Sequence, residues 1–155
     1  YYTNFTYWTQ HCWGVTCVND MEAMLSYQPI TIGDKEQALA DLVRCYEKMM
    51  MRSHTNGGYV NLLDECWKMC EKFHTNIVIM YDHVSCKNVG GLHGLFEDQA
   101  RERGIHLIWI PHDVMDPRTV SRREMREAFS QYMVTVLNEK PLDPTLLDYE
   151  DALSW

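Results

Sequence analysis

Two short, uninterrupted apolar runs constrain the fold of this chain more than any other feature. The first covers residues 77–81, and polar residues, a Gly-Gly pair and a segment of helical period follow it. The second covers residues 107–110 and ends at Pro111. A continuous apolar run of this length is typical of a strand covered on both faces, as in a parallel sheet. Strands that alternate with helices predict β-α-β units with right-handed crossovers.

Helical period and capping signals predict the remaining elements. Asp34 and Ser121 each offer an N-cap with Gln or Glu three residues later, which is the spacing of a capping box. Gly104 is a natural residue to end the helix before the second apolar run. The expected helices cover residues 34–51, 60–73, 89–103 and 121–137.

We therefore predict a single α/β domain over residues 1–155, a three-layer arrangement of the flavodoxin or Rossmann type. It should contain a small parallel sheet of three to four strands with helices on both faces, and the β-rich run 15–18 is a candidate further strand. Residues 140–155 mix acidic and large apolar side chains, so we expect this tail to dock on the domain or on a partner. The aromatic residues of positions 1–13 should pack against another domain or subunit.

Composition excludes several classes of protein. The chain has 155 residues and a net charge of −8, which argues against a nucleic-acid partner. No apolar run approaches the roughly 20 residues that cross a bilayer, and no secretory signal opens the sequence. Six cysteines form an even number, but a chain this rich in core residues does not need disulfides, so we expect a reducing, cytoplasmic location. Because the sequence begins with Tyr1, we expect it to be part of a longer chain.

Cys86 stands in the loop that should follow the first strand. Ligands of open α/β sheets bind beyond the carboxyl ends of the strands, so a thiol in this loop is placed for metal ligation or nucleophilic chemistry. The neighbouring Lys87 and His83, and the start of the next helix, favour the thiolate form. If the two strands are neighbours, His83 and His112 should both face the same crevice.

Other motifs suggest weaker candidates. Gly90 and Gly91 should open a helix, where unpaired amides attract anions, although the spacing fits neither the dinucleotide fingerprint nor the Walker motif. Cys66 and Cys70 lie one turn apart on an apolar stripe, which favours packing in the core over zinc binding. Two alternatives of another class stay open, a phosphate- or nucleotide-binding module at the Gly-Gly pair and a thiolate-zinc module that uses Cys12, Cys17, Cys66 and Cys70.

From His54 to Leu137 the chain resembles the 2-hydroxyacyl-CoA dehydratase family, which is related to the subunits of benzoyl-CoA reductase. The order and spacing of the matching pieces are those of the family's C-terminal domain, and the match covers over half of the chain. The pieces are the strand 77–80, Ser85-Cys86-Lys87, the Gly-Gly pair, Glu102-Arg103-Gly104-Ile105, the run from Asp116 to Ser121, and Met125-Arg126.

The resemblance implies a 4Fe-4S cluster that three cysteines hold, two from an N-terminal domain and one, matching Cys86, from the C-terminal domain. It also implies a paralogous second subunit, an ATP-dependent iron–sulfur activator protein that delivers one electron, and an acyl-CoA substrate. The thioester would become a ketyl radical anion, which loses its hydroxyl group and yields the enoyl-CoA. His83, Lys87, Gly90 and Gly91 would then surround the cluster as its outer contacts.

We therefore expect the C-terminal domain of an oxygen-sensitive, heterodimeric lyase that removes water from a 2-hydroxyacyl-CoA. About 200 to 250 residues that carry two further loop cysteines should precede Tyr1. Without them this chain should hold no complete cluster and should be inactive. The nearest alternative within the family is a subunit of a benzoyl-CoA reductase type of enzyme.

Overall fold

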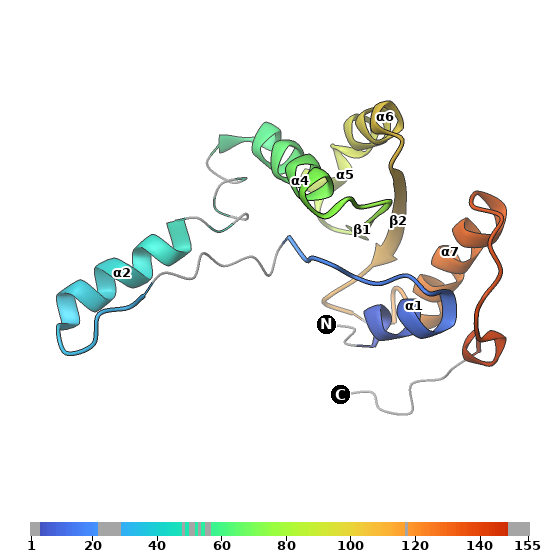
Figure 1. Cartoon of the computed structure of the whole chain (residues 1–155), viewed down its shortest axis with the longest axis horizontal. Helices are drawn as coiled ribbons and strands as arrows, with labels where there is room; N and C mark the ends of the chain where they lie inside the picture. Colours follow the sequence, from blue (N-terminus) through green and yellow to red (C-terminus); the bar gives the residue numbers. More distant parts are fainter. Residues whose placement is uncertain are drawn as a thin grey trace. The chain divides into compact units, whose positions relative to one another are not determined.

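The computed structural model describes residues 4–21, 29–47, 49, 52, 54, 57–116 and 118–148. The chain divides into two compact units, one of residues 1–17 with 76–155 and one of residues 18–75. Figure 1 labels the elements in chain order, which are α1 (Phe5–Trp13), α2 (Lys35–Glu47), α4 (Tyr59–Phe73), β1 (Ile77–His83), α5 (Lys87–Gly90), α6 (His93–Arg103), β2 (His106–His112), α7 (Arg122–Thr135) and the 3-10 helix η1 (Pro144–Leu146).

The sheet is a parallel pair, which confirms the mixed α/β class. Strands β1 and β2 pair from Ile77 opposite His106 to His83 opposite His112, and α5 and α6 connect them. The described residues form two strands, whereas the sequence predicted three to four. The predicted strand at residues 15–18 is wrong, because the Val15 amide donates to the Thr9 carbonyl at 3.1 Å and so completes the C-terminal cap of α1.

One side of β2 packs against α1 and α7, and this is the core of the first unit. Phe129 of α7 is fully buried and makes edge-on ring contacts with Phe5, Trp8 and Trp13 of α1, with centroids 5.9, 5.7 and 6.4 Å away. The buried cluster consists of Phe5, Trp8, Cys12, Trp13, Ile108, Ile110, Val120, Met125, Phe129 and Met133.

This core corrects the expectation that the N-terminal aromatic residues pack against another domain or subunit. Phe5, Trp8 and Trp13 are buried within the chain itself, because α7 supplies the apolar surface that they need. Tyr7 is exposed at 62%, whereas Tyr1 and Tyr2 lie outside the described residues.

The opposite side of β2 contacts α6. Side chains alternate along a strand, so Trp109 points away from Ile108 and Ile110. Its ring stacks on His93 at 3.7 Å between centroids and meets Phe96 edge-on at 6.2 Å. In Figure 1, α1 and α7 lie together on one side of β2, and α6 lies on the other.

The capping signals predicted two helix starts correctly. The Ser121 hydroxyl accepts the Glu124 amide at 3.2 Å, and the Glu124 carboxylate accepts the Ser121 amide at 2.7 Å, which is a full capping box for α7. The Asp34 carboxylate accepts two amides of the first turn of α2. Helix α2 ends at Glu47, and residues 48, 50 and 51 of its predicted end lie outside the described residues.

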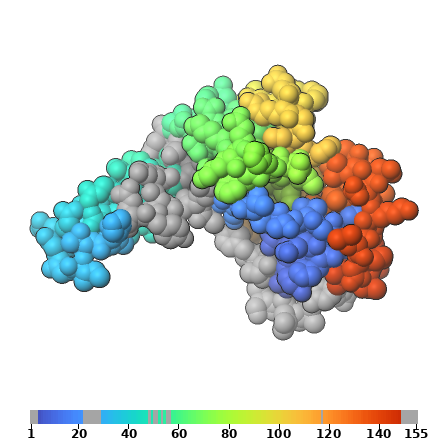
Figure 2. All heavy atoms as spheres, viewed as in Figure 1, coloured from blue at the N-terminus to red at the C-terminus, as the bar shows by residue number. Residues whose placement is uncertain are grey.

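The described part of the C-terminal tail lies against α1. The Leu142 amide donates to the Cys12 carbonyl at 2.7 Å, and the Trp8 indole N–H donates to the Leu146 carbonyl at 2.8 Å. Figure 2 shows the surfaces of α1 (blue) and the C-terminal residues (red) in contact. Residues 149–155 lie outside the described residues.

In the second unit, buried side chains follow one stripe of α4. Cys66 and Cys70 belong to it, together with Leu63 and Trp67, as the helical spacing predicted. Within the described residues, no helix combines the length and the apolar character needed to span a bilayer.

Candidate functional site

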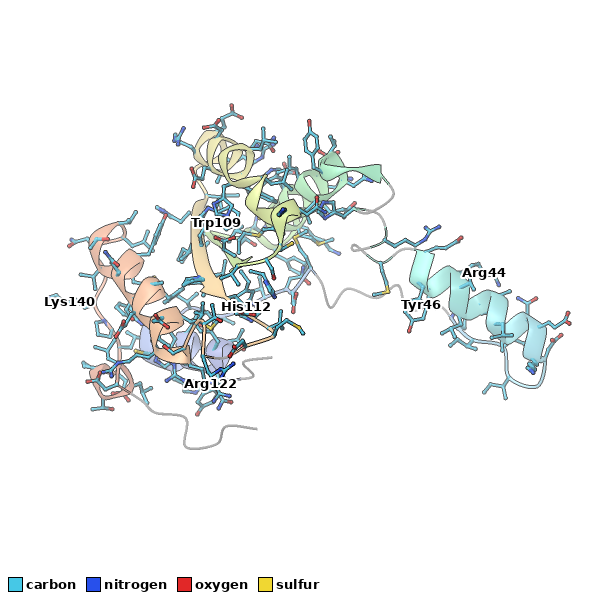
Figure 3. All side chains as sticks on the ribbon, turned by 180° about the vertical axis from the view of Figure 1, so that it is seen from behind. Arg44, Tyr46, Trp109, His112, Arg122 and Lys140 are labelled. Carbon is cyan, nitrogen blue, oxygen red and sulfur yellow. The ribbon has the colours of Figure 1, made fainter. Side chains whose placement is uncertain are left out.

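The candidate site lies where the two strands end. The parallel register places His83 opposite His112, so the loops that follow β1 and β2 leave the sheet at the same edge. The Val84 amide donates to the His112 carbonyl at 3.1 Å and extends the pairing beyond the last residues of the strands. Figure 3 shows His112 at this end of β2 and Trp109 further back along the strand. This is the edge at which open α/β sheets bind their ligands.

Cys86 occupies the loop after β1, and hydrogen bonds fix its backbone on both sides. Its amide donates to the His83 carbonyl at 2.8 Å, which closes a tight turn, and its carbonyl accepts the Gly90 amide at 3.0 Å. The residue is the N-cap of α5. The residue is half-buried and forms no disulfide. Cys86 therefore lies just beyond the carboxyl end of β1 and not inside the core.

The Gly-Gly pair does not open a helix, which corrects the sequence prediction. Helix α5 begins at Lys87, ends at Gly90 and has Gly91 as its C-cap, and α6 starts two residues later. Glycine is a poor helix former, so a pair of them ends a helix more readily than it starts one. The Gly90 and Gly91 amides donate to the carbonyls of Cys86 and Lys87, both at 3.0 Å, so they serve α5 and are not offered to an anion.

Lys87 and Gly90, two of the residues predicted to surround a cluster, are both exposed in the structure. Lys87 is exposed on the first turn of α5. A Cβ atom added to Gly90 would meet no atom within 4 Å, so the space above this residue is open. A side-chain carbon would therefore fit at Gly90 without a clash.

His83 is 19% exposed and contacts both strand-end loops. On one side, its Nδ1 lies 3.2 Å from the Ser85 amide and 3.1 Å from the Ser85 hydroxyl. On the other side, its Nε2 lies 3.3 Å from the Val114 amide and 3.9 Å from the Asp113 carboxylate. The His83 and His112 rings are 5.9 Å apart, so the structure brings the two predicted histidines together.

Asp113 is a residue of this site that the sequence interpretation missed. Its buried carboxylate accepts the amides of Met115 at 2.9 Å and Asp116 at 3.2 Å, which fixes the loop after β2. The Met115 hydrogen bond, more than any other contact, holds the pKa of Asp113 below its usual range, although burial opposes this shift. An Asp directly after a strand is a common turn former, and this signal would have identified it.

Burial, the largest cause, lowers the pKa of His112, and a positive charge on His83 lowers it further when that ring is protonated. His112 is therefore a neutral ring in the wall of the site. The side chains of a hydrolytic triad are all present here, in Ser85, His83 and Asp113. However, the Val114 amide donates to His83 Nε2, which is the nitrogen that faces Asp113. The 3.9 Å between Nε2 and the carboxylate is too long for a hydrogen bond. This arrangement does not form the proton relay of a triad.

The described residues contain no complete set of ligands for a metal ion. Among the described residues, no group of three or more His, Cys, Asp or Glu side chains could hold a metal ion. Cys86 is not part of such a group among these residues. Burial raises the pKa of the Cys12 thiol, and its Sγ lies 3.5 Å from the Asp143 carbonyl, which opposes a role as a zinc ligand. No protein-family model, no curated protein and no solved structure matches this chain.

Proposed function

We propose that this chain is the C-terminal part of an iron–sulfur 2-hydroxyacyl-CoA dehydratase subunit. In this proposal, the Cys86 thiolate binds one iron of a 4Fe-4S cluster, and cysteines from an N-terminal domain complete the ligand set. The observation that supports it most directly is the position of Cys86, a half-buried residue without a disulfide, in the loop after β1 at the carboxyl end of a parallel strand pair. The complete domain would be a three-layer α/β fold in which further strands extend the pair.

The chain's own residues would serve this role in distinct ways. The two backbone hydrogen bonds of Cys86 hold its Cα–Cβ bond in one direction, so the thiolate needs little ordering when it binds iron. The positive charge of Lys87 would offset the negative charge of a thiolate-bound cluster. The open space at Gly90 would allow the cluster or its covering domain to lie close to α5. When bound, the cluster would supply one-electron chemistry.

The proposed partners follow from the same assignment. They are the N-terminal domain of the subunit, a paralogous second subunit, an ATP-dependent iron–sulfur activator protein and an acyl-CoA thioester. A benzoyl-CoA reductase type of subunit would use the same cysteine. An assay of the complete complex would separate the two, because a dehydratase converts a 2-hydroxyacyl-CoA to the enoyl-CoA and a reductase consumes the aromatic ring of its thioester.

The alternatives of another class have less support. A phosphate-binding module needs unpaired amides at the Gly-Gly pair, and the amides of Gly90 and Gly91 donate within α5. A zinc module needs the thiolate of Cys12, and burial disfavours that charged form.

The test is the iron content of the complete subunit, purified without oxygen, with and without Cys86→Ser. We expect the variant to lose most of its iron and its visible iron–sulfur absorption, because serine does not replace a thiolate ligand. Cys17→Ser is the matched control, since Cys17 is an exposed cysteine of the same chain, and it should keep the iron of the unaltered protein. Full iron content in Cys86→Ser would contradict the proposal.

A further inference from the structure

We infer that His83 is a positioning residue whose imidazole joins the loop after β1 to the loop after β2 and so fixes the backbone next to Cys86. The inference deepens the proposed function, on which it rests for the role of Cys86. The joining of the loops itself follows from the contacts of the ring. No proton transfer and no change of charge on His83 is required.

The first loop is tied to the ring through Ser85. The Ser85 amide and hydroxyl both approach Nδ1, at 3.2 and 3.1 Å. The next residue is Cys86, whose amide donates to the carbonyl of His83 itself. The side chain and the backbone of one residue therefore hold the two positions that determine where the thiol points.

The second loop is tied to the ring through Val114. The Val114 amide donates to Nε2 at 3.3 Å. Asp113 fixes this loop independently, because its carboxylate accepts the amides of Met115 and Asp116. His83 consequently holds the Cys86 loop against a loop that is already well ordered.

A neutral imidazole has one donor nitrogen and one acceptor nitrogen, so its tautomer decides which contacts form together. With the proton on Nδ1, the ring donates to the Ser85 hydroxyl and accepts the Val114 amide, so both loops are tied, but the Ser85 amide then loses its acceptor on the ring. With the proton on Nε2, the ring accepts from Ser85 alone, and the Nε2–H faces the Asp113 carboxylate at 3.9 Å, beyond hydrogen-bond distance. Of the two neutral tautomers, only the form with the proton on Nδ1 joins both loops, through the Ser85 hydroxyl and the Val114 amide.

Three substitutions in the full 155-residue chain test this inference. His83→Ala removes both ties. In His83→Asn the new side-chain oxygen lies near the position of Nδ1 and keeps only the tie to Ser85, whereas in His83→Gln the longer side chain reaches towards the position of Nε2 and keeps only the tie to Val114. His106→Ala is the matched control, because His106 lies at the other end of β2 and pairs with the Tyr132 hydroxyl at 3.3 Å.

The readouts are amide hydrogen exchange at Val114, which reports on the second tie, and the rate at which iodoacetamide alkylates Cys86 in the reduced chain, which reports on the first. We expect His83→Ala to accelerate both rates about five- to tenfold, the effect of losing a typical hydrogen bond. His83→Asn should accelerate amide exchange at Val114 and leave the alkylation of Cys86 unchanged. His83→Gln should accelerate the alkylation of Cys86 and leave amide exchange at Val114 unchanged. His106→Ala should leave both rates unchanged.

Unchanged rates at Val114 and Cys86 in His83→Ala would overturn the inference. If that variant does not fold, the Asn and Gln variants decide, because equal effects of the two substitutions on both rates would also overturn it. Neither readout involves iron. If His83 does not couple the loops but Cys86 still binds iron, only this inference is refuted. If His83 couples the loops but Cys86 binds no iron, only the proposed function is refuted.

Discussion

Replacement of Phe129 by alanine should strongly destabilise the first unit. The ring is fully buried and contacts three aromatic rings of α1. Removal of a buried Phe side chain costs about 3–5 kcal/mol, and because edge-on aromatic contacts are also lost we expect at least the middle of that range, about 4 kcal/mol. For a chain of this size, that corresponds to a melting temperature lowered by about 8–16 °C.

The assay is urea and thermal unfolding of the full chain, followed by tryptophan fluorescence and circular dichroism. Fluorescence reports on the relevant unit because Trp8 and Trp13 contact the ring of Phe129. Phe73→Ala is the matched control, since Phe73 is 39% exposed on α4, and it should cost less than about 1 kcal/mol. Equal costs for the two substitutions would refute the view that α1 and α7 form one core.

Three further predictions concern the cap of α7, the acid stability of the sheet and the C-terminal tail. Ser121→Ala should cost about 1 kcal/mol in urea unfolding, because it removes the N-cap, and a cost near zero would argue against the capping box. Burial lowers the pKa of His112, so the unfolded chain takes up the proton first; stability should fall as the pH drops below about 6.5, and His112→Phe should flatten that slope. Trp8→Phe removes the bond to the Leu146 carbonyl and should speed proteolysis of the tail severalfold, whereas an unchanged rate would show that the indole does not anchor it.

The sequence predicts well those elements whose signals are local. The strands Ile77–His83 and His106–His112 contain the predicted apolar runs and extend them by polar or partly polar ends. Hydrophobicity marks the buried centre of a strand but not the residues that continue the hydrogen-bond ladder. For this reason the apolar pattern stops short of His83, although it is the last residue of β1.

The differences between sequence and structure arise where distant parts of the chain decide the outcome. The burial of Phe5 and Trp8 depends on Phe129, which lies far away in the sequence, so no local sequence pattern predicts this contact. Residues 15–18 have the composition of a strand, but the Val15 amide donates to the Thr9 carbonyl at the end of α1 and so is not available for a strand ladder. Local preference therefore fails where tertiary contacts compete for the same groups.

The candidate site depends on the register of the two strands, and the register depends on the core. Side chains alternate between the faces of a strand, so a shift of one residue would turn His112 to the face that Trp109 occupies and would separate Val114 from the His83 ring. Ile108 and Ile110 oppose that shift, because it would remove both of them from the core with α1 and α7 and place the indole of Trp109 there instead. The geometry around Cys86 is therefore stabilised by apolar residues that never contact it. Substitutions in this core should therefore alter the reactivity of the Cys86 thiol, because they disturb the strand register that brings His83 to both loops.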